Sequence, residues 1–197
     1  MTLSSHARGF TDRLAVPVGR GLVRLRVSAD GLTVTGLLLA LVGAAVVLLI
    51  GPLTGGIILA VGAAIDGLDG TVARLRGTVT RFGAFFDSVA DRVSEGVLFG
   101  VVAWLVRDQP VLFAAALLVG VMAQLTSYIR AKAEALGWEA SGGLVERPER
   151  MLIMIPGIAF DFIPVALSIL AVGTTVTVIQ RVVVVRRQAD ADQGRGR

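Results

Sequence analysis

The chain has 197 residues, of which 54% are hydrophobic and only 17% are charged, and its formal net charge is +4. A soluble domain of this length carries more charge and shorter apolar runs, so the composition predicts an integral membrane protein. The positive charge does not indicate a nucleic-acid-binding protein, because the basic residues form no aromatic-interleaved module. The chain has no cysteine, which excludes disulfides and thiol chemistry.

Residues 1–30 are predicted to form an N-terminal cytoplasmic segment. They contain scattered arginines and no continuous apolar core, which is unlike a signal peptide. Leu14, Val18, Leu22 and Leu25 recur at helical spacing among these arginines. The pattern predicts an amphipathic juxtamembrane helix that lies on the membrane surface.

The uncharged run 31–65 is too long for one membrane-spanning helix. As a single helix it would measure about 52 Å, against a hydrocarbon core of about 30 Å. The sequence GPLTGG at 51–56 interrupts the run, so we expect a helical hairpin with spans near 32–50 and 55–72. The remaining predicted helices cover 82–106, 111–136, 150–160 and 165–185, with turns at RDQP and DFIP.

Together these helices predict an all-α polytopic membrane domain with six transmembrane helices over 31–187. The tail 188–197 is predicted to be disordered. Six spans place both termini on the same side, and every Lys and Arg except Arg107 then falls on that side. The positive-inside rule makes this side cytoplasmic, so we expect a multi-pass protein of the cell membrane with cytoplasmic termini.

Four aspartates lie close together in a region where charge is costly. Asp66 and Asp69 are three residues apart on the second predicted helix, and Asp87 and Asp91 are four apart on the third. Both spacings place the carboxylates on one helical face, and antiparallel packing would bring all four into one cavity near the cytoplasmic interface. Hard divalent cations relieve the repulsion among such carboxylates, and two of them can clamp a pyrophosphate during a displacement reaction.

Two other interpretations of the aspartates remain. Pairing with nearby arginines or exposure to cytoplasmic water explains one aspartate more readily than two helically spaced pairs. A divalent-cation transporter is an alternative of a different class, because intramembrane acids also line ion paths. Against it, the acids gather near one interface, and Gly70 and Arg74 beside them suit a nucleotide.

The spacing of these residues resembles the signature of the CDP-alcohol phosphotransferase family. The matching positions are Asp66, Asp69, Gly70, Ala73, Arg74, Gly83, Asp87 and Asp91. The resemblance implies a homodimeric enzyme in which the four aspartates hold two Mg²⁺ ions, or Mn²⁺, and Asp91 is also the base that deprotonates the acceptor alcohol. It implies transfer of the phosphatidyl group of CDP-diacylglycerol to that alcohol, with release of CMP. The implied CDP-diacylglycerol contacts are Asp30, Gly31, Leu32, Thr33, Gly70, Ala73, Arg74 and Thr80.

A second, basic cluster bears on the acceptor. SYIRAKAEALG at 127–137 and ERPERML at 146–152 place cations at the cytoplasmic ends of two predicted helices. Such cations suit a phosphorylated acceptor, although positive-inside charge or contact with anionic lipid gives a similar pattern. The two segments resemble those of actinobacterial phosphatidylinositol-phosphate synthases. This resemblance implies an actinobacterial source, inositol phosphate as the acceptor, and Arg130, Arg150 and Arg181 as ligands of its phosphate. A phosphatidylglycerophosphate synthase, or a family member with another acceptor, is the alternative.

Overall fold

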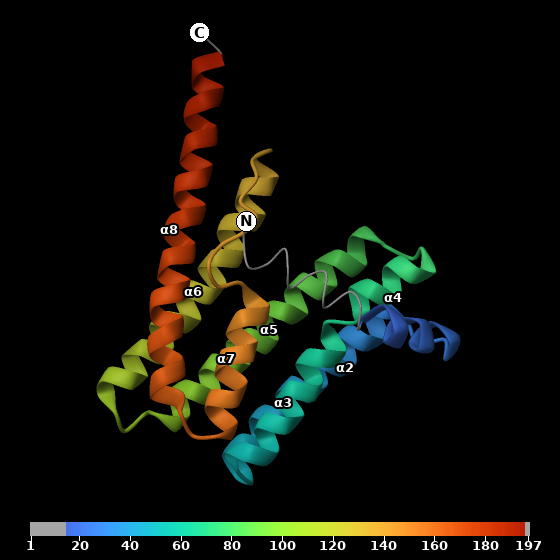
Figure 1. Cartoon of the computed structure of the whole chain (residues 1–197), viewed down its shortest axis with the longest axis vertical. Coiled ribbons are helices and arrows are strands. Elements are labelled where there is room, and N and C mark those ends of the chain that lie inside the picture. Colours follow the sequence, from blue (N-terminus) through green and yellow to red (C-terminus); the bar gives the residue numbers. More distant parts are fainter. Residues whose placement is uncertain (1–14, 196–197) are drawn as a thin grey trace. The chain divides into compact units, whose positions relative to one another are not determined.

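The computed structural model describes residues 15–195, and this part of the chain consists of helices, turns and loops without strands. Its named helices are α2 (Ala29–Leu49), α3 (Pro52–Asp66), α4 (Asp69–Arg76), α5 (Arg81–Leu105), α6 (Pro110–Ala135), α7 (Arg147–Ala159) and α8 (Ile163–Arg195). Figure 1 shows them in chain order. The predicted all-α class is therefore confirmed.

Four stretches of the described chain are long and apolar enough to cross a membrane: Ala29–Leu49, Pro52–Arg76, Pro110–Ala135 and Ile163–Gln193. The other two predicted spans correspond to α5, which carries Asp87, Asp91, Arg92 and Glu95, and to α7, which has only 13 residues. Since length and composition alone qualify four helices, the count of six spans stays a prediction.

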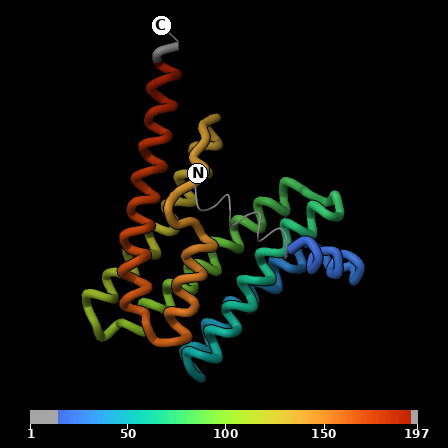
Figure 2. Tube along the Cα trace, viewed as in Figure 1, coloured from blue at the N-terminus to red at the C-terminus, as the bar shows by residue number. Residues whose placement is uncertain are grey.

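The chain divides at Val101–Val102 into two compact units. In the first unit, α2 packs against α3 and α4. Small residues allow the close approach of α2 and α3, because a Cβ atom at Gly43 would lie 2.9 Å from Leu59 Cγ, and one at Gly62 would lie 3.0 Å from Leu39 Cβ. The hairpin predicted from GPLTGG is present, with Pro52 as the first residue of α3. Figure 2 shows the chain reversing between these two helices.

The second predicted helix is interrupted in the structure. The sequence pattern predicts one helix over 55–72, whereas α3 ends at Asp66 and α4 begins at Asp69 after a turn at residues 67 and 68. The Gly67 N–H donates to the Ala63 carbonyl, and the Leu68 N–H donates to the Ile65 carbonyl. The second of these hydrogen bonds joins residues three positions apart, as in a 3₁₀-helix. It tightens the last turn of α3 and redirects the chain.

An N-terminal helix covers residues 15–24 of the described chain and contacts α4. A Cβ atom at Gly19 would lie 3.1 Å from both Thr71 Cγ2 and Leu75 Cδ1, and the Arg76 Nη2 donates to the Val23 carbonyl at 3.3 Å. Leu14 of the predicted amphipathic pattern lies outside the described residues. The placement of this helix on a membrane surface stays a prediction.

In the second unit, α8 packs against α6 and α7. The loop 137–146 follows α8 in the opposite direction. Its contacts, in chain order, join Trp138 to Asp192, Glu139 to Gln188, Gly142 to Arg181, Leu144 to Gln180 and Val145 to Thr177. Gly173 of α8 permits this close contact, since a Cβ atom there would collide with the Val145 side chain.

The C-terminal tail differs from its prediction. The composition of 188–197 predicts disorder, whereas α8 continues to Arg195. Two interactions support the extension: the Trp138 Nε1 donates to Asp192 Oδ2 at 2.7 Å, and the Gln188 Nε2 donates to the Glu139 carbonyl at 2.6 Å. An ion pair of 3.0 Å joins Arg186 to Asp190 one turn further along the helix.

Candidate active site

Three carboxylates meet in the first unit. Asp66 is the last residue of α3, Asp69 is the first residue of α4, and Asp87 lies in the second turn of α5. One carboxylate oxygen from each lies within 4.8 Å of the others, and the Asp66 and Asp69 side chains are buried. An all-carboxylate donor set at this spacing suits a hard divalent cation, which would offset the repulsion among the three charges.

Asp66 is positioned by the contact between α2 and α3. A Cβ atom at Gly36 would lie 2.9 Å from Asp66 Cβ, 3.2 Å from the Gly62 carbonyl oxygen and 3.3 Å from Asp66 Cα. The α2 backbone therefore rests directly on the residue that carries the first carboxylate. Only glycine permits this distance, because two of the three neighbouring atoms belong to the backbone.

Hydrogen bonds orient Asp69. The Thr33 hydroxyl of α2 donates to Asp69 Oδ2 at 2.6 Å, and the Gly70 N–H donates to Oδ1. Thr33 is itself buried, so this contact is shielded from water. Asp69 also lies at the N-terminus of α4, where the helix dipole favours a negative charge.

A cavity of about 280 Å³ lies beside this carboxylate cluster. It is lined by Ala29, Asp30, Thr33, Asp69, Gly70, Ala73, Arg74, Thr78, Val79, Thr80, Gly83, Ala84 and Asp87. Six of the eight residues predicted to contact CDP-diacylglycerol belong to this lining. The other two, Gly31 and Leu32, do not line the cavity, and the Leu32 side chain is buried.

The walls of the cavity are set by local interactions. The Thr80 hydroxyl accepts from the Gly83 N–H at 2.9 Å and so caps the start of α5, which carries Asp87. A Cβ atom at Gly70 would lie 3.4 Å from Arg74 Nη1. The Arg74 Nη2 donates to the Thr71 hydroxyl at 3.2 Å, which holds the guanidinium at the cavity wall.

Thr78, Val79 and Ala84 line the cavity but were not predicted from the sequence. They surround the turn between the two halves of the aspartate pattern. A turn is already implied there by Gly77, which adopts φ 66° and ends α4. That glycine is the signal that indicates the turn, although it does not identify the residues that face the cavity.

Asp91, the fourth predicted ligand, lies one turn beyond Asp87 on α5 and is outside the group of three within 4.8 Å. Its Oδ2 pairs with the Arg92 Nη2 at 3.3 Å, and 18% of its side chain is exposed. Its roles as metal ligand and base therefore stay predictions.

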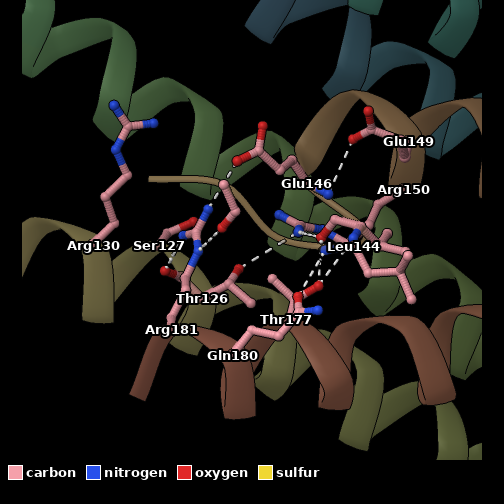
Figure 3. A network of polar contacts seen from close by, with 12 residues as sticks. Thr126, Ser127, Arg130, Leu144, Glu146, Glu149, Arg150, Thr177, Gln180 and Arg181 are labelled. Carbon is pink, nitrogen blue, oxygen red and sulfur yellow. Dashed lines mark hydrogen bonds and ion pairs between the residues drawn. The ribbon is translucent and has the colours of Figure 1, made fainter. Parts of the chain in front are cut away.

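The second unit contains a separate polar network around two of the predicted acceptor-binding arginines (Figure 3). Arg150 of α7 is 1% exposed, and its Nη1 donates to the Val145 carbonyl at 3.3 Å and to the Thr126 hydroxyl at 3.5 Å. Arg181 of α8 is 6% exposed and donates to the carbonyl oxygens of Gly142 and Thr126 at 2.9 and 2.5 Å. Both guanidinium groups therefore converge on Thr126 of α6.

Arg130 occupies a different environment from the other two arginines. Its side chain is 52% exposed, and its Nε donates to Glu134 Oε1 at 2.8 Å within α6. In Figure 3 it lies to one side of the network that joins Arg150 and Arg181. It is nevertheless close enough to act electrostatically on Arg181, as Arg150 is. The structure thus brings the three predicted arginines into one basic region, in which Arg130 is the accessible member.

Comparison with known proteins gives consistent matches. Residues 26–185 match the family model for CDP-alcohol phosphatidyltransferase. The chain is 40% identical over 189 residues to the phosphatidylinositol phosphate synthase of Mycobacterium marinum, covering 89% of this chain and 80% of the relative. The synthase of Streptomyces avermitilis is 39% identical over 209 residues, covering 96% and 85%.

Solved structures agree with this similarity. The Mycobacterium tuberculosis phosphatidylinositol phosphate synthase with CDP-DAG bound superposes with a TM-score of 0.78 at 34% identity, covering 88% of this chain and 94% of that one. The same enzyme in complex with manganese and citrate gives a TM-score of 0.75 at 37% identity, covering 87% and 88%.

Proposed function

Because the chain belongs to the CDP-alcohol phosphatidyltransferase family, we propose that it transfers the phosphatidyl group of CDP-diacylglycerol to inositol phosphate, giving phosphatidylinositol phosphate and CMP. The observation that carries this proposal is the cluster of Asp66, Asp69 and Asp87 beside a cavity lined by Arg74. The names of the relatives support the choice of substrates.

The carboxylate cluster would hold divalent metal, for which we propose two Mg²⁺ ions, with Mn²⁺ as a substitute. Asp66, Asp69 and Asp87 present oxygen ligands at a spacing that fits such ions, and Asp91 would complete the second site. When bound, the ions would neutralise charge on the pyrophosphate and on the departing CMP.

The cavity would hold the nucleotide part of CDP-diacylglycerol. Arg74 and the Thr80 region line it, and Asp30 and Thr33 lie on the α2 side. Gly31 and Leu32 would act indirectly, by holding the start of α2 in place. Ser28 caps this helix, because its hydroxyl accepts from the Gly31 N–H at 3.1 Å.

Asp91 would act as the general base. In this reaction the acceptor hydroxyl gives its proton to the Asp91 carboxylate, and its oxygen forms a bond to the phosphorus on the lipid side of the pyrophosphate. The bond between that phosphorus and the bridging oxygen breaks, and CMP leaves. The partial exposure of Asp91 leaves it accessible to an acceptor.

The acceptor's phosphate would bind to Arg130, Arg150 and Arg181. Guanidinium groups bind phosphate with paired, charge-assisted hydrogen bonds, and this region combines two buried arginines with one accessible arginine. A free inositol acceptor would supply no anion to these arginines.

We further propose that the chain crosses the cell membrane six times as a homodimer, with both termini and the active site facing the cytoplasm. Under this proposal α5 and α7 are the two additional spans. The charges of α5 would be tolerated because they line the active site rather than face lipid.

The test is an acceptor panel. Purified protein with CDP-diacylglycerol and Mg²⁺ is assayed for CMP release with inositol phosphate, inositol and glycerol 3-phosphate. We expect turnover with inositol phosphate. Productive turnover with glycerol 3-phosphate alone would overturn the choice of acceptor. Absence of thermal stabilisation by CMP would instead favour a cation transporter, which has no nucleotide site.

A further inference from the structure

Besides Glu134, which pairs with Arg130, a second carboxylate contacts an arginine of the basic region. Glu146 Oε1 accepts from the Arg181 Nη2 at 3.1 Å, which is the contact drawn between them in Figure 3. Glu146 is the more exposed partner, since 24% of its side chain is accessible against 7% for Arg181. Glu146 is therefore the member of this ion pair that is more accessible to solvent.

Arg181 does not depend on Glu146 for its position. Its Nε donates to the Gly142 carbonyl and its Nη1 donates to the Thr126 carbonyl, so two backbone groups from different elements already fix the guanidinium plane. The ion pair with Glu146 adds charge rather than geometry. Loss of the carboxylate charge would leave the guanidinium oriented, with its positive charge no longer offset by Glu146.

Glu146 also caps α7 together with Glu149. The Glu146 side chain accepts from the Glu149 N–H, and the Glu149 side chain accepts from the Glu146 N–H at 3.0 Å. The two acids therefore share one local structural role. Only Glu146 also contacts an arginine of the basic region among the interactions described for the pair.

We propose that Glu146 sets the affinity of the acceptor site, because its carboxylate occupies the position on Arg181 that the acceptor's phosphate must take. This inference rests on the proposed function, in which Arg181 binds that phosphate. Two anions cannot share one guanidinium edge without repulsion, so binding of phosphate competes with the internal ion pair. Glu146 thus favours acceptors with a strongly charged phosphate over weaker anions.

The test is Glu146→Gln, which keeps a hydrogen-bond acceptor for Arg181 and a cap for α7 but removes the charge. We expect the KM for inositol phosphate to fall about threefold to tenfold while the KM for CDP-diacylglycerol stays unchanged. A lower KM separates this role from a merely structural one, because loosening of the site would raise it.

Two variants provide controls. Glu149→Gln removes the other charge of the cap and should leave the acceptor KM within about twofold, since its carboxylate faces a backbone N–H. Glu146→Asp keeps the charge and should not lower the KM. An unchanged or higher KM in Glu146→Gln, or equal decreases in any two of the three variants, would overturn the proposal.

A second measurement does not require turnover. Thermal stabilisation by inorganic phosphate should reach half its maximum at a lower phosphate concentration in Glu146→Gln than in the unsubstituted protein. Equal concentrations in the two proteins, or no stabilisation of either, would contradict the role of Glu146. Failure of the unsubstituted protein to use inositol phosphate would instead reject the proposed function.

Discussion

The contact between Gly36 and Asp66 permits a sharp test of how the first carboxylate is positioned. In Gly36→Ala the new Cβ atom would lie 2.9 Å from Asp66 Cβ and 3.2 Å from the Gly62 carbonyl oxygen. Carbon atoms pack at about 3.5 Å, so α2 and α3 would have to separate locally by about 0.6 Å. Rotation of a side chain cannot relieve the contact, because the Asp66 Cα and the Gly62 carbonyl are part of the backbone.

Two effects follow from this separation. Overpacking costs about 1–3 kcal/mol, and the better helix propensity of alanine returns up to about 1 kcal/mol, which leaves a modest loss of stability. For a chain of this size about 1 kcal/mol lowers the Tm by roughly 3 °C. Because an error of about 1 Å at a catalytic site can cost about 100-fold, we expect kcat/KM to fall about tenfold.

The assay compares Gly36→Ala with Gly100→Ala. Gly100 is a helical glycine of α5 at which a Cβ atom would meet nothing within 4 Å beyond its chain neighbours and the backbone of its own helix, so it controls for the change in helix propensity. Transfer activity is measured against metal concentration, and Tm is measured in the same detergent. Equal Tm and equal metal dependence in the two variants would show that the approach of α2 does not position Asp66.

Three further predictions concern single interactions. Asp87→Asn should lower transfer by at least about 100-fold and weaken Mn²⁺ binding measured by calorimetry, with unchanged helical circular dichroism; retained Mn²⁺ affinity would remove Asp87 from the metal site. Thr126→Val deletes the hydroxyl that accepts from Arg150 and should raise the acceptor KM about threefold without changing the KM for CDP-diacylglycerol; an equal rise in both values would refute a local effect. Trp138→Phe removes the N–H that donates to Asp192 and should speed proteolysis at the end of α8 with activity retained; unchanged proteolysis would mean that other contacts hold this extension.

Much of the first unit could be predicted from the sequence, because its chemistry is concentrated in one segment. The spacing of the aspartates indicated the cluster, and three of the four share one site. The sequence spacing predicted that Asp66 and Asp69 share one face of a single helix. Instead they lie on two helices joined by a turn. A single helix and this interrupted helix have the same residue spacing, so periodicity alone cannot distinguish them.

The helix ends show where local sequence signals were missed. α7 begins at Arg147, three residues before its predicted start, because Glu146 and Glu149 form a capping box. That pattern is visible in the sequence. By contrast, DFIP was predicted to end α7 and does so, with Asp161 in the left-handed region at φ 58°.

The second unit could be predicted only in part. The sequence indicated the basic residues, but neither Thr126 nor the loop 137–146 showed a pattern that linked them to Arg150 and Arg181. The contacts of Arg150 and Arg181 with Thr126 join residues 24 and 55 positions apart, and such pairings depend on tertiary packing. For the same reason, composition predicted disorder for residues 188–197, whereas contacts with the distant loop support a helix that continues to Arg195.

The turn between α3 and α4 has a mechanical consequence for the bound state. Asp66 ends α3, whereas Asp69 begins α4, which contacts α2 through Thr33 and the N-terminal helix through Gly19 and Arg76. Cations held by both carboxylates would therefore join the two helices across this turn, in addition to the hydrogen bond between Thr33 and Asp69. Metal would then stiffen the lipid-nucleotide site as it loads it, and the metal-free protein would be the looser form.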